Sequence, residues 1–445
     1  MSVGAPAQGR ALIKSWDADT RWDRLALGGI VAGVLLRALF VFILHPPHDY
    51  VYSDMQGYVT RAMEVARGHA QVPRDLAFYP PGTHLLLAAS FKLFGTGPAG
   101  LHWADAAWFA LSAVSPAFVW RLVRELLGPA AGAVTAVLAA LAPLFILYAG
   151  FFTSETPSLA LLSGALWLGY RARSAPPLQA LSLSVAGGLL GGLLVATRPQ
   201  FILNLLLVAA ALLQSARTRW RAVPGFAVGL IGVVAVVVAI NSNNAGHVTG
   251  FSENSGLTFF QAQCNIHRVS TGRPPGFGYV FENPVAFSLR RGHDAYFPNH
   301  VGWDSGFFFR QGLDCIGSDG LGHVPILARD VIDLTATSIP WPLMNEIALS
   351  RIGDIANVLY SAALVALTLL VPLARRHWEI DERTRSGTNI LLAHLAMVIP
   401  VAVVFGAEPR YRVPYDIFGL ALMGWLIAGA ITRRRAPPVI PRASG

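Results

Sequence analysis

A single aspartate, Asp54, stands in the polar stretch VYSDMQGYVTRAMEVARG (51–68), directly after the first long apolar run of the chain. A carboxylate in such a place can act as a general base, which takes the proton of a hydroxyl group while that hydroxyl attacks a carbon atom. An acid in the first turn of a helix also offsets the positive end of the helix dipole. The residues themselves leave both interpretations of Asp54 open.

A second acid, Glu155, lies in FFTSETPSL between two apolar runs. An acid at the end of a membrane helix is costly unless it is paired or hydrated, which favours a place in a polar site. There it would orient a substrate or tune Asp54. The alternative is again a helix start, with Thr153 or Ser154 as the capping residue and Glu155 in the first turn.

Three arginines lie at comparable turns: Arg198 in ATRPQF, and Arg410 and Arg412 on either side of Tyr411 in EPRYRVPY. Arginine binds phosphate oxygens in pairs and remains charged, so these three are candidates to bind a phosphate if the protein acts on one. The alternatives are side chains that snorkel toward lipid headgroups, or an ion pair of Arg410 with Glu408. Further candidates for the same pocket are Tyr79, His84 and Glu408.

The twelve histidines form neither an HExxH motif nor a short pair on one helix face. His45 and His48 flank two prolines, which is weak evidence for a metal site. We therefore assign no metal and no other cofactor, and we leave a divalent ion at the acidic residues as the alternative.

The composition indicates which elements carry these residues. Of the 445 residues, 54% are hydrophobic and only 13% are charged, which is about half the charged share of a soluble protein. Apolar runs of about 20 residues predict an all-α polytopic membrane protein with about ten transmembrane helices. We place them at 25–44, 100–123, 130–150, 156–171, 180–196, 199–214, 224–241, 351–373, 387–406 and 413–431.

Basic residues gather at one set of polar ends, whereas the other set holds an excess of acids. By the positive-inside rule the basic ends, and with them both termini, are cytoplasmic. The net charge of +9 is spread between the apolar runs, so nucleic acid is not a predicted partner.

No cleavable signal peptide is evident, and the first span is expected to stay in the protein. Arg37 lies inside that span and either pairs with an acid such as Asp105 or snorkels.

Two large segments then lie on the outer side. In the first outer loop (45–99), Ser53 and Gln56 have the form of a capping box, and helical spacing predicts an amphipathic interfacial helix that ends at Gly68. A second, shorter interfacial or re-entrant helix should run from Pro80 and Pro81 to Gly95. The remaining divisions are a cytoplasmic segment (1–24), a transmembrane region (25–241), an exoplasmic loop or cap (242–350), a second transmembrane region (351–431) and a cytoplasmic tail (432–445).

The exoplasmic loop contains both cysteines, Cys264 and Cys315. An oxidising compartment favours a disulfide between them, and two free buried thiols are the alternative. Its aromatic residues suit contacts with sugars, and equally suit a small packed cap.

Several stretches resemble one known family in their order and in their common outer location. SDMQGYVTRAMEVARG, YPPGTHLLLAASFKLFG, TSETPSLALLSGALWL, ATRPQFILNLL and EPRYRVPYDIFGLAL are similar to segments of the GT-C polytopic glycosyltransferases. The resemblance is to the dolichyl-phosphate-mannose protein mannosyltransferase-like group and the bacterial lipid-A aminoarabinose transferases. Many relatives have two adjacent acids in the first loop, but here Met55 follows Asp54, which argues against a paired-carboxylate metal site. The chain also has no Trp-Trp-Asp motif, which argues against an oligosaccharyltransferase.

The resemblance implies transfer of a sugar from a polyprenyl-phosphate donor to a hydroxyl of a glycan, lipid or protein acceptor, outside the cytoplasm. The enzyme would lie in the bilayer of a bacterial inner membrane. A lipid-linked sugar transporter or flippase and a non-catalytic membrane subunit are the alternatives, and the absence of a visible repeat argues against a transporter. The implied roles are catalysis for Asp54 and Glu155 and donor-phosphate binding for Arg198, Arg410, Tyr411 and Arg412.

Overall fold

The computed structural model describes residues 7–264, 303–336, 347–406 and 408–433, and all regular elements in these ranges are helices. Parts of three predicted divisions, the N-terminal segment, the exoplasmic loop and the C-terminal tail, lie outside the described residues. The aromatic stretch RPPGFGYVFENP falls among them. The predicted all-α class is confirmed for the described part of the chain.

Each of the ten predicted apolar runs lies in one helix or in two or three consecutive helices. Lipid offers no hydrogen-bond partner to the backbone, so helices are the expected form for such runs. The helices are α1 (Ala7–Leu39), α4 (Pro98–Leu127), α5 (Pro129–Leu141), α6 (Pro143–Leu147), α7 (Glu155–Ala172), α8 (Pro177–Thr197), α9 (Ile202–Leu213), α10 (Arg219–Ala245), α15 (Ile347–His377), α16 (Glu382–Ala396), α17 (Val398–Phe405) and α18 (Asp416–Arg433).

The predicted number of ten spans is not confirmed. Within the described residues, seven helices are long and apolar enough to cross a membrane, and up to eight if the bent pair α5 and α6 counts as one span. These two helices meet at 52°, directly before Pro143, whose ring cannot continue a straight helix. Helix α9 belongs to the shorter apolar helices, and α7 carries Glu155, Arg171 and several hydroxyl residues.

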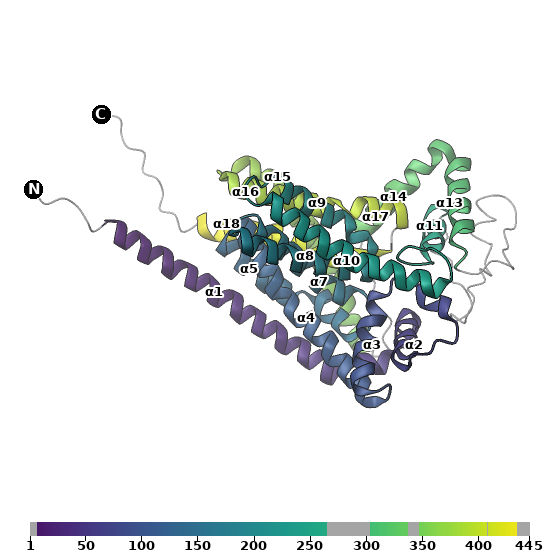
Figure 1. Cartoon of the computed structure of the whole chain (residues 1–445). Coiled ribbons are helices and arrows are strands. Elements are labelled where there is room, and N and C mark those ends of the chain that lie inside the picture. Colours follow the sequence, from purple (N-terminus) through teal and green to yellow (C-terminus); the bar gives the residue numbers. More distant parts are fainter. Residues whose placement is uncertain (1–6, 265–302, 337–346, 407, 434–445) are drawn as a thin grey trace, which may run out of the picture.

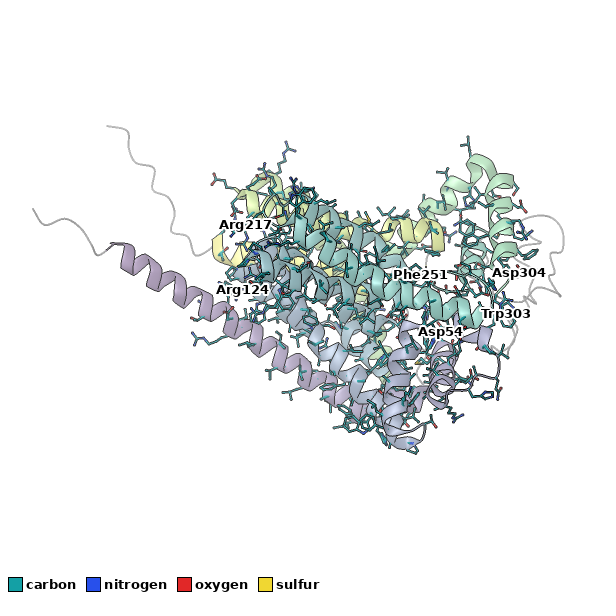
Figure 2. All side chains as sticks on the ribbon, in the orientation of Figure 1. Asp54, Arg124, Arg217, Phe251, Trp303 and Asp304 are labelled. Atoms are coloured by element: carbon teal, nitrogen blue, oxygen red, sulfur yellow. A yellow bond between two sulfur atoms is a disulfide. The ribbon has the colours of Figure 1, made fainter. Side chains whose placement is uncertain are left out.

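Five helices gather at one end of the bundle, and we call them the loop layer: α2 (Ser53–Arg67), α3 (Gly82–Phe94), α11 (Ser255–Gln263), α13 (Ser305–Asp319) and α14 (Val324–Ala336). The first turns of α1 and the last turn of α18 lie at the opposite end (Figure 1). Figure 2 shows Arg124 and Arg217 at that opposite end, whereas Asp54, Phe251 and Trp303 lie near the loop layer. The basic ends and the outer loops of the sequence are thus separated in space.

The two interfacial helices form within a residue or two of their predicted bounds. Gly68 ends α2 in the left-handed conformation with a φ of 71°, which glycine adopts without a steric cost. The predicted capping box is wrong, because Tyr52 precedes the helix without a side-chain cap and Ser53 is already its first residue. Arg61, which the helical pattern places off the apolar stripe, is buried and binds the Asp75 carboxylate at 2.9 Å.

The two cysteines form a disulfide between α11 and α13, with their Cα atoms 5.5 Å apart. The alternative of two free thiols is therefore wrong. Around the bond, Phe260 and Phe308 pack with Phe78 of the first outer loop. Phe260, Phe308 and their neighbours thus form a packed cap, which also joins the two outer segments.

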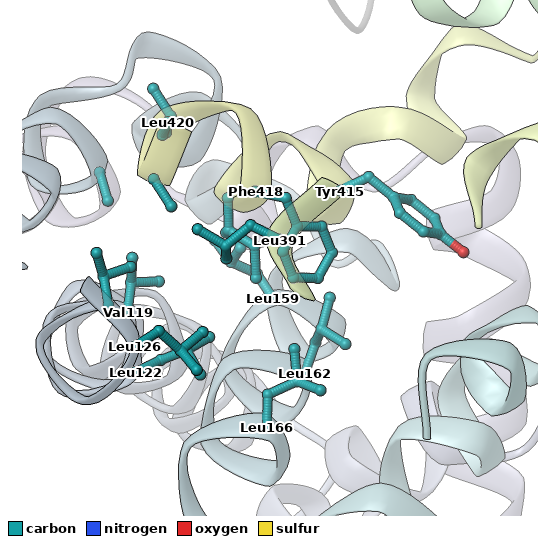
Figure 3. Packing of buried hydrophobic residues seen from close by; sticks show 14 of the residues in the cluster. Val119, Leu122, Leu126, Leu159, Leu162, Leu166, Leu391, Tyr415, Phe418 and Leu420 are labelled. Atoms are coloured by element: carbon teal, nitrogen blue, oxygen red, sulfur yellow. The ribbon is translucent and has the colours of Figure 1, made fainter. Parts of the chain in front are cut away.

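The largest apolar core lies between the transmembrane helices. Helices α4 and α7 contribute parallel rows of leucine side chains, spaced three or four residues apart so that they lie on one face of each helix. Helices α16 and α18 cover these rows with Leu391 and Phe418 (Figure 3). The labelled members of α4 and α7 are Val119, Leu122, Leu126, Leu159, Leu162 and Leu166.

Arg37 neither pairs with Asp105 nor snorkels, so both predicted alternatives are wrong. Its guanidinium is fully buried and donates to the Ser112 hydroxyl at 2.9 Å. It also donates to the carbonyl oxygens of Gly33, Ala139 and Ala140. Two of these partners, the Ala139 and Ala140 carbonyls, lie just before the bend between α5 and α6, which sequence cannot locate in advance.

Helices α8 and α10 approach each other closely through glycines. A Cβ atom on Gly229 of α10 would lie 2.4 Å from the Val185 carbonyl oxygen and 2.8 Å from the Leu189 nitrogen of α8. A Cβ atom on Gly188 would lie 2.2 Å from the Phe226 carbonyl oxygen. Membrane helices pack tightly through such small residues, since the contact brings backbone against backbone.

We expect Gly229→Ala to lower the free energy of unfolding by about 1–3 kcal/mol, because the added methyl group forces α8 and α10 apart. Thermal unfolding of the purified protein in detergent measures this change. Gly232→Ala on the same helix is the matched control, since a Cβ atom there has no neighbour within 4 Å. Equal unfolding temperatures for the two variants would contradict the close approach.

Candidate active site

A cavity of about 800 Å³ lies where the loop layer meets the ends of the transmembrane helices. Its walls come from α2, from the segment after it, from the first turn of α7, from the turn after α8 and from the segment before α18. These elements are far apart in sequence, and each carries one to three of the predicted residues. On the cavity lie Asp54, Tyr79, Glu155, Arg198, Glu408, Arg410 and Tyr411.

Asp54 stands in the first turn of α2 and binds an arginine. Its Oδ2 atom lies 2.7 Å from Nη1 of Arg410, and the Tyr79 hydroxyl donates to its Oδ1 atom at 3.1 Å. Burial opposes ionisation of this carboxyl, but the charge of Arg410 and the hydrogen bonds from Arg410 and Tyr79 outweigh it and hold the pKa of Asp54 below its usual value. Asp54 is therefore a charged carboxylate at neutral pH.

Glu155 and Arg198 form a buried ion pair across the cavity wall. The side chains are 1% and 7% exposed, and Nη2 of Arg198 donates to Oε1 of Glu155. Nε of Arg198 donates to the Ser154 hydroxyl at 2.8 Å. Ser154 precedes α7 without capping it, since its hydroxyl oxygen accepts the hydrogen bond from Arg198 instead. The residue before a proline avoids the helical region, and Arg198 before Pro199 accordingly has an extended backbone that ends α8.

Several polar atoms of this wall have no hydrogen-bond partner within the described part of the chain. They are Nη1 of Arg198, Oε2 of Glu155 and the hydroxyl oxygen of Thr153, and all three residues line the cavity. A buried polar atom without a partner costs free energy. The wall therefore holds one cationic donor, one carboxylate oxygen and one hydroxyl whose hydrogen-bonding capacity is unused within the described residues.

The segment before α18 supplies the second arginine. Arg410 contacts Glu408 through Nε and Oε1 at 3.5 Å in addition to Asp54, so the predicted Glu408–Arg410 pair is present. The ring of Tyr411 lies 5.4 Å from Cζ of Arg198, a distance suited to a cation–π contact. Tyr411 follows Arg410 in the sequence and contacts Arg198 through its ring, so it lies between the two arginines on the cavity wall.

Two predicted residues do not line the cavity. Arg412 faces away from it and contacts Asp416 at 3.0 Å and the Ser361 hydroxyl at 2.9 Å. Residues 409–415 form a 3-10 helix, in which side chains two apart point to different sides, so Arg410 and Arg412 separate. His84 is buried in α3, and burial lowers its pKa to about 3, which keeps the ring neutral.

Some cavity residues were not predicted. Tyr58 lies four residues after Asp54 on α2, and this helical spacing would have indicated a shared face. The stretch from Val248 to Thr258 closes one side of the cavity, and no sequence signal points to it. It is held in place by backbone hydrogen bonds from Glu253 and Asn254 to the Ala77 and Phe78 carbonyl oxygens.

The acids on the cavity do not form a metal site among the described residues. Asp54 and Glu408 bind Arg410, and Glu155 binds Arg198. The group that could hold a metal ion in the described ranges consists of His48, His102 and Asp105, and none of these residues lines the cavity.

One family model matches part of the chain. It describes dolichyl-phosphate-mannose-protein mannosyltransferases and matches residues 79–241. The resemblance predicted from the sequence is confirmed over these residues. The matched part includes Glu155 and Arg198, whereas Asp54 and Arg410 lie outside it.

Solved structures of an oligosaccharyltransferase from Archaeoglobus fulgidus are also similar to the chain. One, tethered with an acceptor peptide containing the NVT sequon, has 15% identity and a TM-score of 0.47 over 92% of this chain and 50% of that one. Another, archaeal AglB with an inhibitory peptide and a dolichol-phosphate, has 16% identity and a TM-score of 0.46 over 92% and 51%. The chain thus spans about half the length of these proteins. A search of curated protein sequences finds no match.

We expect Arg198→Ala to destabilise the protein by about 3–5 kcal/mol, because it leaves the buried Glu155 carboxylate without its partner. The double variant Arg198→Ala/Glu155→Ala should recover much of this loss. Thermal unfolding followed by tryptophan fluorescence measures both. The control is Arg329→Ala, since Arg329 pairs with Asp333 at 3.6 Å and is 64% exposed, where ion pairs contribute about 1 kcal/mol or less. Equal losses for the single and the double variant would contradict the pairing.

Proposed function

We propose that the chain is an integral-membrane glycosyltransferase that moves a sugar from a polyprenyl-phosphate donor to an acceptor hydroxyl. The observation that carries this proposal is the meeting of Asp54 and Glu155 with Arg198 and Arg410 on one cavity at the loop-layer end of the bundle. The match of residues 79–241 to the mannosyltransferase family model supports it. The acceptor class, whether glycan, lipid or protein, is decided by the experiments below.

Asp54 is the general base in this proposal. Its carboxylate takes the proton of the acceptor hydroxyl, and the oxygen attacks the anomeric carbon from the face opposite the phosphate. One bond forms as the other breaks, so the sugar is transferred with inversion. Glu155 lines the cavity and is paired with Arg198, and in this proposal it orients the acceptor.

The arginines stabilise the leaving group. When the bond between the anomeric carbon and the phosphate oxygen breaks, the donor phosphate gains one negative charge and departs as a polyprenyl phosphate. Nη1 of Arg198 and the guanidinium of Arg410 face this developing charge, so their stabilisation grows toward the transition state. Two arginines supply this charge, and the proposal needs no metal at the acids.

Arg410 also connects donor binding with proton removal by Asp54. It binds Asp54 at 2.7 Å in the structure, and a donor phosphate would compete with Asp54 for the same guanidinium. Loss of the Arg410 contact raises the pKa of Asp54, which makes the carboxylate a better base. The donor thus activates the base when it binds.

The protein is multi-pass, and we propose the bacterial inner membrane as its location with both termini in the cytoplasm. The separation of Arg124 and Arg217 from Asp54 along the bundle supports this orientation (Figure 2). The cavity would then open at the exoplasmic surface, and the divisions predicted from the sequence (1–24, 25–241, 242–350, 351–431 and 432–445) would follow the same orientation.

We expect Asp54→Asn to reduce sugar transfer by about 100-fold or more, since general bases contribute about 10²–10⁴ to a rate. The assay uses cells that lack the chain, complemented with each variant, and mass spectrometry of their surface glycans, envelope lipids and secreted proteins. The matched control is Glu64→Gln, which removes an acid from the same helix away from the cavity.

Two outcomes would overturn the proposal. Unchanged modification with Asp54→Asn, at normal protein levels in the membrane, would indicate a non-catalytic subunit. Accumulation of a sugar-lipid on the cytoplasmic side in cells without the chain, with transfer intact once the lipid is supplied outside, would indicate a flippase.

A binding measurement tests the role of Arg198 in holding the donor phosphate separately from sugar transfer. We expect native mass spectrometry to detect polyprenyl monophosphate on the wild-type protein, and Arg198→Gln to weaken this binding by about tenfold or more, since hydrogen bonds to charged groups contribute about 1.5–3 kcal/mol. Arg67→Gln is the control, because Arg67 is exposed at the end of α2. Equal affinities in the two variants would remove Arg198 from the donor site.

A further inference from the structure

A cluster of two histidines and one buried aspartate lies apart from the cavity, where the turn after the first span meets α4. His48 belongs to the 3-10 turn Pro47–Tyr50, and His102 and Asp105 lie one turn apart near the start of α4. One ligand atom from each lies within 4.8 Å of the others. We propose that these three residues bind a zinc-class transition-metal ion, which fastens the turn to α4.

The geometry is close to that of a bound ion. Zinc–nitrogen and zinc–oxygen bonds of about 2.0–2.2 Å in a tetrahedral site place ligand atoms about 3.3 Å apart. In the structure, Nδ1 of His48 lies 2.5 Å and Nδ1 of His102 lies 3.9 Å from Oδ2 of Asp105. Each distance must change by less than about 1 Å. The His102 side chain is 64% exposed, so it can turn without disturbing the backbone.

The neighbours of these residues orient them as ligands. The His48 backbone nitrogen donates to Oδ1 of Asp105 at 3.2 Å, which leaves Oδ2 directed at both histidine rings. Oδ1 of Asp49 lies 3.4 Å from Nε2 of His48, so a proton on Nε2 is held there while Nδ1 binds the ion. Carboxylates behind metal-binding histidines commonly fix the tautomer in this way.

The ligand types select the metal. Two imidazoles and one carboxylate match zinc and its neighbours, with water at the fourth position, whereas calcium and magnesium prefer oxygen ligands alone. The ion would contribute to structure, because none of the three residues lines the cavity. It would hold the turn Pro47–Tyr50 that leads into α2.

The test uses the full chain, purified in detergent with a tag free of histidine and stripped with a chelator. Cobalt is the probe, because its visible absorption reports nitrogen and oxygen ligation. We expect about one equivalent to bind and zinc to displace it. His102→Ala should weaken binding by about tenfold or more, since even outer partners of metal ligands contribute about 10–100-fold. His69→Ala is the matched control, an exposed histidine of the same outer loop.

Thermal unfolding gives a second readout that does not depend on the enzyme assay. An ion that binds only the folded state raises its unfolding temperature, so zinc should stabilise the wild-type protein and His69→Ala but not His102→Ala. His102 is exposed, so its loss leaves the fold intact. No cobalt bands in the wild type, or equal bands and equal stabilisation in His102→Ala, would overturn the proposal and leave a hydrogen-bonded His48–Asp105 pair alone.

Discussion

Charged groups at the ends of membrane helices are stable only when each is paired or hydrated, and the cavity is built on that constraint. Glu155 and Arg198 neutralise each other in a nearly dry wall, while Asp54, Arg410 and Glu408 form a second, more exposed group. Neither group exists within one element, because each joins residues from at least two segments that are far apart in sequence. The charges therefore fix how these helix ends meet, and the same contacts leave one Arg198 donor, Nη1, without a partner among the described residues.

The apolar contacts of the loop layer hold the cavity from the other side. The cap closed by Cys264 and Cys315 packs on Phe78, and Phe78 adjoins Tyr79, which donates to Asp54. A chain of direct contacts thus runs from the disulfide to the carboxylate. Packing in the cap and chemistry in the cavity are consequently parts of one arrangement rather than separate modules.

Much of this arrangement follows from residue type and spacing. The apolar runs predict the helices. The charged residues at polar turns, Asp54, Glu155, Arg198 and Arg410, can be predicted as site residues because a charge at the end of a membrane helix must be paired or hydrated. Arg412 could not be separated from Arg410, because the 3-10 geometry of residues 409–415 decides which side each faces. The fully buried Arg37 and the cavity stretch 248–258 depend on tertiary partners that no local pattern encodes. The number of spans also depends on bends such as the one before Pro143.

The position of the disulfide has a consequence for how the protein is made. Its cysteines are 51 residues apart and both precede α15, α16 and α18, so both are synthesised before those helices. Chains form their N-terminal parts first during translation. The covalent link between α11 and α13 can therefore close while Arg410 is still inside the ribosome, and the last helices insert against a cap that is already fixed. In a reducing cell-free system this covalent link would not form, and the last helices would insert against a cap held by packing alone.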